Sequence, residues 1–318
     1  MQRLIGLLLL IFIPLATMAQ TDYPIHDDFR AACRITAPLG RGVLGIGNAF
    51  LTAMPKGMRT DRELMIDKIK ITSTVDGEEF GVWVVTPKGG TAPRPAILVL
   101  HGGGFVFKGA PYHYDLAKEY ARRTGSVVVM VDYRTAHNNP YGTTLQDCVD
   151  AWRWMISESQ NLGIDIARTA VVGDSAGGFL AIKTVLESDI RPSKLMLIYP
   201  VVDCSMRTES MAKFSDTPVW NSKLNAKMWE YYLQGATEES LLDLAENELQ
   251  KMPATYVETA EFDCLRDEGN TFATLMQRAG VATRLIEAKG TMHGFDMAQR
   301  SGITERQIAE RCKWLGEW

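Results

Sequence analysis

The strongest constraint on the fold is a rhythm that runs from about residue 66 to the C-terminus. Short runs of β-branched and other apolar residues alternate there with amphipathic helical runs. This alternation predicts an α/β fold, in which a mostly parallel sheet has helices on both faces. Asp76-Gly77, between the first two runs, is typical of a hairpin turn. The expected strands cover residues 66–75, 80–86, 95–100, 126–131, 169–172, 194–199, 254–259 and 283–288.

Two segments do not fit this rhythm: about residues 20–60 precede it, and about residues 203–250 interrupt it between two expected strands. We expect both to fold into one small helical cap, within a single domain that covers residues 20–318. Ligands enter such sheets at the carboxyl ends of the strands, so a cap placed there would line the substrate pocket. The second segment is rich in Trp, Tyr and Met. These side chains suit an acyl chain or a sugar ring, or they only pack the cap onto the sheet.

Residues 1–19 have the features of a signal peptide. Arg3 gives a positive start, Leu4–Leu15 is almost entirely apolar, and small residues precede a cleavage site after Ala19. An uncleaved membrane anchor is the alternative. Pro14 and the short apolar run oppose it, because a membrane span takes about twenty apolar residues. We therefore expect a secreted or periplasmic protein with no stable membrane span after cleavage.

Charge and cysteine content limit the possible partners. The net charge is −4 and no cluster of Lys and Arg is visible, so nucleic acid is not an expected partner. The five cysteines match no C-x-x-C pattern of a metal or redox site. Export permits disulfides, and Cys204 and Cys264 each follow one of two strands that we expect to be neighbours. A disulfide between Cys204 and Cys264 is therefore a hypothesis.

The strongest local motif is G-D-S-A-G-G at residues 173–178, between an expected strand and a helix with an apolar face. This is the setting of a nucleophile elbow, in which a sharp, strained turn exposes the serine hydroxyl. Gly173 and Gly177 let the strand and the helix approach closely, because they lack side chains. Ser175 is therefore the candidate nucleophile, near a helix N-terminus that favours negative charge. Asp174 either braces the turn or is a solvated turn residue.

A second motif, H-G-G-G at residues 101–104, directly follows the expected strand 95–100. Its glycines let the backbone turn N–H groups into a cavity. Together with the N–H of Ala176, these groups would form an oxyanion hole. The alternatives are a glycine-rich turn without a function and a phosphate-binding loop. The second would need the G-x-x-x-x-G-K-[ST] pattern, which is absent. His101 is expected to hold the loop by hydrogen bonds rather than to react.

A serine nucleophile needs a base and an acid, which follow it along the chain in the order acid, then histidine. His293 is the only histidine after Ser175, so the order of the chain selects it as the base. The acid should follow the expected strand 254–259. Asp263 falls closest to the expected loop position, and Asp267 is the second choice. The acidic residues in this region are Glu261, Asp263, Asp267 and Glu268.

Four motifs thus occur in order: H-G-G-G at 101–104, G-D-S-A-G-G at 173–178, D-C-L-R-D-E-G at 263–269 and H-G-F at 293–295. Over about residues 66–317, their order and spacing resemble the hormone-sensitive-lipase-like family of α/β hydrolases, in its bacterial esterase branch. Each motif alone is only moderately specific, whereas the combination is highly specific. One departure is Cys264, which stands where the family usually has proline after the acid.

This resemblance implies an eight-stranded sheet and a helical cap built from the N-terminal region and an insertion. It also implies hydrolysis of carboxylic esters without a metal or an organic cofactor. The residues carried over are Asp263 as the acid, His293 as the base, and Gly102, Gly103 and Ala176 as oxyanion donors.

The sequence therefore predicts a serine esterase that cleaves short-chain acyl or acetyl esters through an acyl-enzyme. The expected partner is a small ester, with an acetylated sugar as one candidate. A catalytically silent binding protein on this fold is an alternative, because a fold alone does not prove activity. Such proteins usually lack a member of the Ser-His-Asp set, which this chain has in full. A serine peptidase of the same architecture is another alternative, but those enzymes usually carry a large extra domain.

Overall fold

The computed structural model describes residues 23–35, 37, 39–54 and 56–318, and the predicted signal peptide lies outside them. The strands are β1 Leu64–Thr72, β2 Glu79–Pro87, β3 Arg94–Leu100, β4 Val127–Asp132, β5 Ile164–Asp174, β6 Lys194–Ile198, β7 Ala254–Phe262 and β8 Thr283–Met292. The helices are η2 Asp27–Phe29, η3 Ala32–Arg34, α2 Arg41–Ala53, α3 Pro111–Thr124, α4 Thr143–Ser157, α5 Ser159–Leu162, α6 Ala176–Leu186, α7 Glu209–Lys213, α8 Ser222–Leu233, η4 Leu241–Asp243, α9 Glu246–Leu249, α10 Arg266–Arg278, η5 Phe295–Met297 and α11 Gly302–Gly316. Within this described part, no helix is both long and apolar enough to cross a membrane.

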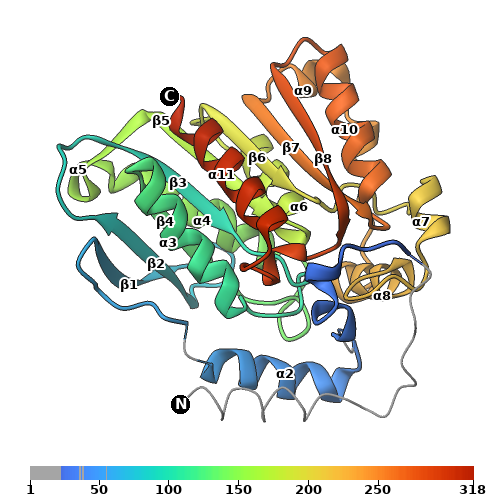
Figure 1. Cartoon of the computed structure of the whole chain (residues 1–318). Helices are drawn as coiled ribbons and strands as arrows, with labels where there is room; N and C mark the ends of the chain where they lie inside the picture. Colours follow the sequence, from blue (N-terminus) through green and yellow to red (C-terminus); the bar gives the residue numbers. More distant parts are fainter. Residues whose placement is uncertain (1–22, 36, 38, 55) are drawn as a thin grey trace.

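The described strands form one eight-stranded sheet in the order β1-β2-β4-β3-β5-β6-β7-β8 (Figure 1). β2 pairs antiparallel with β1, as the predicted hairpin requires, and also antiparallel with β4. The other neighbouring strands are parallel. The predicted α/β fold with a mostly parallel sheet is therefore confirmed. β5 begins at Ile164, earlier than predicted. The prediction missed this part of the strand because residues 165–168 are partly exposed and interrupt the apolar run in the sequence.

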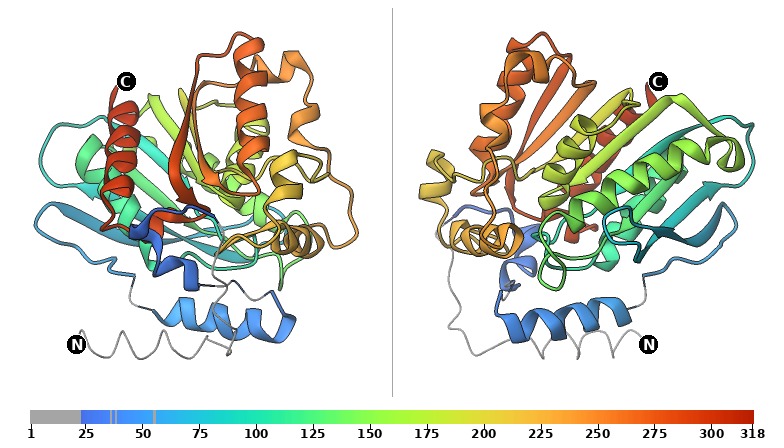
Figure 2. Two further views of the ribbon diagram at one scale, coloured as in Figure 1. Left: turned by 45° about the vertical axis from the view of Figure 1, so that its right-hand side comes forward. Right: turned by 180° about the vertical axis from the view of Figure 1, so that it is seen from behind.

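Helices cover both faces of the sheet (Figures 1 and 2). In β3, side chains alternate between the faces, as the period of two in a strand dictates. Leu98 belongs to the apolar core that the sheet shares with α4, α6 and α10. Ile97 and Val99 belong to the core on the opposite face, under α3 and α11. Because both faces are buried, β3 reads as a continuous apolar run in the sequence.

The described parts of the two interrupting segments, which we call the cap segments (residues 23–60 and 203–250), lie beside each other. Tyr231 Oη donates a hydrogen bond to the carbonyl oxygen of Leu39 (3.1 Å), and the Val219 N–H donates to the carbonyl oxygen of Ile35 (3.2 Å). In Figure 1, α2 and α8 both lie along the lower edge of the molecule. Contacts between segments so far apart in sequence join the N-terminal region to the insertion after β6.

Some of the aromatic residues in the insertion serve packing. Tyr232 stacks on Phe105, with 4.1 Å between the ring centroids, and Trp229 meets Phe179 edge to face at 5.3 Å. Trp229 and Tyr232 are both buried. These two rings therefore pack α8 against α6 and against the segment after β3.

The hypothesis of a disulfide between Cys204 and Cys264 is wrong. All five cysteines lie among the described residues, and all are free. The thiol of Cys204 donates a hydrogen bond to the carbonyl oxygen of Glu238 (3.2 Å). Cys264 is buried, and burial, together with the Asp263 carboxylate that interacts with its thiol, raises the pKa of that thiol. The two sulfurs thus have separate partners although their strands are neighbours.

Candidate active site

Ser175 stands between the end of β5 and the start of α6. Its backbone has φ 54° and ψ −122°, a conformation that residues with side chains rarely adopt. A Cβ atom added to Gly173 would collide with the backbone of Gly177, and one added to Gly177 would collide with the carbonyl oxygen of Leu100. Only glycine fits at both positions, so the turn has the sharp form that the motif predicts.

The structure brings Ser175, His293 and Asp263 together in hydrogen-bonding order. Ser175 Oγ lies 2.8 Å from His293 Nε2, and His293 Nδ1 lies 2.7 Å from Asp263 Oδ2. Asp263 follows β7 and His293 follows β8, and these parallel strands are neighbours. Ser175 and His293 are each 5% exposed, and Asp263 is fully buried. Three residues far apart in sequence therefore meet at one edge of the sheet.

The other acidic candidates face elsewhere. Asp267 Oδ2 accepts a hydrogen bond from the backbone N–H of Ser210 (2.7 Å). Glu261 Oε2 accepts from the N–H of Gly290 (2.7 Å), and Glu268 Oε1 accepts from the N–H of Val202 (2.6 Å). Of the four acids considered from the sequence, Asp263 is the one that contacts His293.

This arrangement can activate a hydroxyl group. An imidazole nitrogen within hydrogen-bonding reach of a serine can take its proton as the oxygen attacks a carbon centre. A carboxylate at Nδ1 holds the proton there, which leaves Nε2 free to accept the serine proton. In the part of the chain that the structure describes, no group of three or more His, Cys, Asp or Glu side chains could hold a metal ion.

The glycine loop at residues 101–104 lies against this turn. β3, which it follows, pairs in parallel with β5, and Leu100 is opposite Gly173. A Cβ atom added to Gly102 would lie 3.1 Å from Ser175 Cβ and would collide with the Asp174 carboxylate. Gly103 has φ 115°, which favours glycine. The structure thus brings Gly102, Gly103 and Ala176, the predicted oxyanion donors, to the same edge of the sheet.

His101 is fully buried and holds this loop. Its Nδ1 lies 2.7 Å from the carbonyl oxygen of Gly102, and its ring stacks on Tyr133 with 4.1 Å between centroids. Tyr133 Oη also donates a hydrogen bond to the carbonyl oxygen of His101 (2.7 Å). Burial lowers the pKa of His101 to about 3, so the ring is uncharged at neutral pH. His101 is therefore a structural residue, as expected from the sequence.

A buried pair of Asp174 and His113 supports the turn from the other side. His113 Nδ1 accepts a hydrogen bond from the Ala110 N–H (2.9 Å), so Nε2 donates to Asp174 Oδ2 (3.2 Å). Burial raises the pKa of Asp174, but the His113 imidazole and the Gly102 N–H outweigh it and lower the pKa. Of the two interpretations of Asp174, bracing is the correct one. His113 itself was missed, because nothing in the sequence pairs it with a residue 61 positions away.

A second buried network, also missed from the sequence, lies behind His293. Arg311 of α11 donates hydrogen bonds to Glu258 on β7 (Nε–Oε2 3.0 Å) and to Asp296 on η5 (Nη1–Oδ2 2.9 Å). Tyr199 Oη donates to Asp296 Oδ2 (3.0 Å), and its ring packs on His293 with 4.7 Å between centroids. The network ties the loop of His293 to β7 and to the last helix.

Replacement of Arg311 by methionine is expected to lower the free energy of unfolding by about 3–5 kcal/mol, because it leaves the carboxylates of Glu258 and Asp296 buried without their cation. Urea denaturation of the two proteins measures this difference. A matched control is Arg284→Met, since the ion pair of Arg284 with Glu310 is partly exposed and should contribute below about 1 kcal/mol. Equal losses in both variants would contradict the stabilising role of the buried network.

Comparisons with known proteins give the following results. A family model described as the alpha/beta hydrolase fold matches residues 97–297. The chain is similar to the ethyl acetate hydrolase of Pseudomonas putida (34% identity over 213 residues, covering 63% of this chain and 65% of that protein). It is also similar to esterase LipI of Mycobacterium tuberculosis (32% over 215 residues, covering 64% and 66%). The match thus spans just under two thirds of the length of each of these relatives. Among solved structures, the chain is similar to a bacterial heroin esterase, with 30% identity and a TM-score of 0.82. The match covers 93% of this chain and 98% of the heroin esterase chain.

Proposed function

The chain belongs to the hormone-sensitive-lipase-like family of α/β hydrolases, and from this we propose that it is a serine hydrolase of carboxylic esters. The observation that carries the proposal is the hydrogen-bonded order of Ser175, His293 and Asp263. The relatives named above, which are called esterases or an ester hydrolase, support the same reaction class.

In the proposed mechanism, the Ser175 oxygen attacks the ester carbonyl while His293 Nε2 takes the hydroxyl proton. His293 then gives this proton to the leaving alcohol, and an acyl-enzyme remains on Ser175. A water oxygen then attacks the acyl carbonyl while His293 takes one of its protons. His293 gives this proton to Ser175 Oγ as the bond between Ser175 and the acyl group breaks, which releases the carboxylic acid product and restores the serine. Asp263 holds the imidazole in the required tautomer and stabilises the imidazolium that forms in each step.

Negative charge develops on the carbonyl oxygen during both attacks. We assign its stabilisation to the backbone N–H groups of Gly102, Gly103 and Ala176, as the family resemblance implies. The N–H of Ala176 belongs to the N-terminus of α6, where the helix dipole favours an anion. Each donor of this kind is worth about 100- to 1000-fold in rate. Asp174 and His113 act only by holding the loop and the turn in position.

The proposed substrates are esters of short acyl groups. The side chains of Trp220 and Met228, from the cap segment 203–250, lie against Gly104. The Trp220 ring is 6.0 Å from the His293 ring, between centroids, and both cap side chains are buried. Large side chains so close to the proposed oxyanion loop leave little room for a long chain. An O-acetylated sugar, in which the sugar is the alcohol part of the ester, is one substrate that suits an exported esterase.

A panel of p-nitrophenyl esters tests this proposal. With acyl chains from acetate to dodecanoate, kcat/KM is expected to be highest for acetate or butyrate and at least about tenfold lower for dodecanoate. A preference for dodecanoate would overturn the short-chain assignment but not ester hydrolysis. Failure to cleave any ester of the panel would favour the silent binding protein.

The N-terminal sequence supports a further proposal, namely that the protein is exported and cut after Ala19. N-terminal sequencing of protein isolated from the medium or the periplasm should then start at Gln20. Protein that stays in the cell with Arg3 still present would contradict export.

A further inference from the structure

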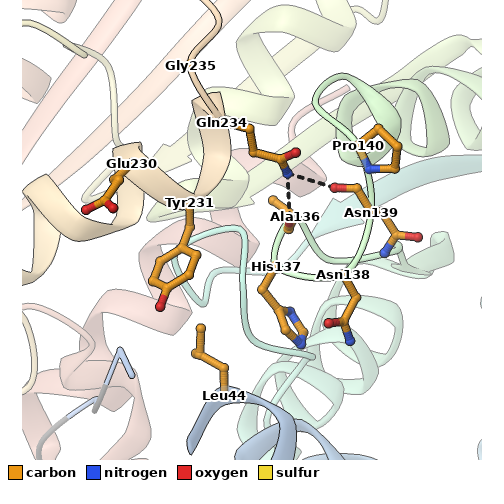
Figure 3. A pocket seen from close by; sticks show the side chains of 10 residues that line it. All are labelled: Leu44, Ala136, His137, Asn138, Asn139, Pro140, Glu230, Tyr231, Gln234 and Gly235. Atoms are coloured by element: carbon orange, nitrogen blue, oxygen red, sulfur yellow. Dashed lines mark hydrogen bonds between the residues drawn. The ribbon is translucent and has the colours of Figure 1, made fainter. Parts of the chain in front are cut away.

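A groove with a volume of about 820 Å³ lies between α2, the C-terminal end of α8 and the loop after β4 (Figure 3). Neither the proposed mechanism nor the family resemblance assigns it a role. Its polar lining comes from side chains of two segments, the loop and α8: His137, Asn138, Asn139, Glu230, Tyr231 and Gln234.

The loop that lines the groove is bonded to the segment that follows the glycine loop. β3 and β4 are parallel neighbours, so the glycine loop after β3 and the groove loop after β4 leave the same edge of the sheet. The Ala136 N–H donates a hydrogen bond to the carbonyl oxygen of Phe105 (2.9 Å), the residue that follows the glycine loop. Asn48 of α2 donates from Nδ2 to the carbonyl oxygen of Val106 (2.7 Å) and accepts from the Lys108 N–H (2.7 Å). The groove loop and α2 are thus both bonded to residues 105–108, the segment that follows the proposed oxyanion loop.

Several polar atoms of the groove have no partner among the described residues. Gln234 uses Nε2 to donate to the carbonyl oxygens of Ala136 (2.7 Å) and Asn139 (2.8 Å), which leaves its own oxygen open. The side chains of Asn138 and Glu230 make no hydrogen bond to the described part of the chain, and both residues are exposed. Figure 3 shows these side chains along the two walls. Amide, imidazole and carboxylate groups can together accept from and donate to hydroxyl groups.

Charge narrows the class of ligand. Among the described residues that line the groove, Glu230 is the only one with a charged side chain, and no lysine or arginine is present. Burial lowers the pKa of His137, so its ring is uncharged at neutral pH. An anionic ligand would therefore find no cation to pair with and one carboxylate to repel it. Tyr231 adds an aromatic ring that can pack against apolar C–H groups. This combination fits an uncharged ligand with many hydroxyl groups.

We propose that the groove binds the neutral saccharide part of an acylated sugar whose ester is cleaved at Ser175. This inference rests on the proposed function and specifies the alcohol part of the substrate. Sugar units bound in the groove would be continuous with an ester at the oxyanion loop. Binding energy from such remote units raises kcat/KM for the extended substrate.

The first experiment separates binding from catalysis. The Ser175→Ala protein is titrated calorimetrically with neutral xylo-oligosaccharides and with oligogalacturonate of similar length. We expect the neutral oligosaccharide to bind at least about tenfold more tightly than the acidic one. Absence of neutral binding, or tighter binding of the acidic oligosaccharide, would overturn the inference. If neutral binding occurs but the wild-type protein cleaves no ester, the proposed function fails and the saccharide site stands.

The second experiment uses the double variant Asn138→Ala, Glu230→Ala. The measured quantity is the ratio of kcat/KM for acetylated xylo-oligosaccharides to kcat/KM for p-nitrophenyl acetate, which has no sugar. We expect this ratio to fall at least about tenfold, mainly through KM. Lys227→Ala is the matched control, because Lys227 is exposed on α8 but does not line the groove, and it should keep the ratio. An unchanged ratio in the double variant would overturn the inference.

Discussion

Replacement of Ser175 by alanine is expected to lower kcat for p-nitrophenyl acetate by about a million-fold, since it removes the atom that forms the acyl-enzyme. Binding of the ester should change little, because the groups that would contact it remain. The fold should also remain, because alanine keeps the Cβ atom and the turn is fixed by Gly173 and Gly177. Initial rates at saturating ester, together with a circular dichroism spectrum, measure both effects.

The control for this prediction is a second serine. Ser210 lies in the cap segment 203–250, and its Oγ donates a hydrogen bond to the carbonyl oxygen of Cys264 (2.8 Å), the residue after Asp263. Ser210→Ala should retain turnover within about tenfold of the wild type, because its hydroxyl has no contact with His293. A Ser175→Ala protein with turnover close to that of the wild type would refute the assignment of the nucleophile.

Replacement of Asp263 by asparagine is expected to lower kcat by about ten-thousand-fold. The asparagine amide would donate to His293 Nδ1, which would force the imidazole proton onto Nε2. Nε2 would then face the Ser175 hydroxyl as a donor and could not take its proton. The same ester assay measures the loss.

The matched variant is Asp267→Asn, because Asp267 was the second choice for the acid. Its carboxylate bonds to the Ser210 N–H and to Arg266 instead of His293. We expect activity within about tenfold of the wild type. Severe loss in Asp267→Asn with a harmless Asp263→Asn would transfer the role of the acid to Asp267.

The sequence predicted those parts of the fold and the site that depend on local patterns. The apolar runs predicted the strands because a strand covered on both faces, such as β3, is apolar throughout. The strained turn at Ser175 was predictable because its glycines, Gly173 and Gly177, stand in one short motif between an expected strand and an expected helix. His293 followed from chain order, since the other histidines precede Ser175.

Other features depend on contacts that no local pattern encodes. Asp263 and Asp267 are four residues apart, and only the direction in which each carboxylate points distinguishes them. Asp174 and His113 lie 61 positions apart, and Arg311 and Glu258 lie 53 positions apart. The disulfide hypothesis failed for the same reason, since strand adjacency does not fix where a thiol points.

The groove between α2, α8 and the loop after β4 also could not be predicted from the sequence. Residues 136–140 read as an ordinary polar connection, and Glu230 reads as an exposed position of a helix. They form a lining only because α8 packs its opposite side, with Met228, against Gly104. The groove therefore depends on how the cap segments pack against the rest of the chain.

The role of Ser175 as the nucleophile is tested most directly by covalent labelling with diethyl p-nitrophenyl phosphate, followed by peptide mass spectrometry. This ester phosphorylates an activated serine and leaves a stable adduct, because the analogue of the acyl-enzyme hydrolyses slowly. We expect one diethylphosphoryl group on Ser175, with activity lost in proportion to labelling, and no such label in the Asp263→Asn protein over the same time. Labelling of another residue with Ser175 unmodified, or full activity after Ser175 is labelled, would contradict this role.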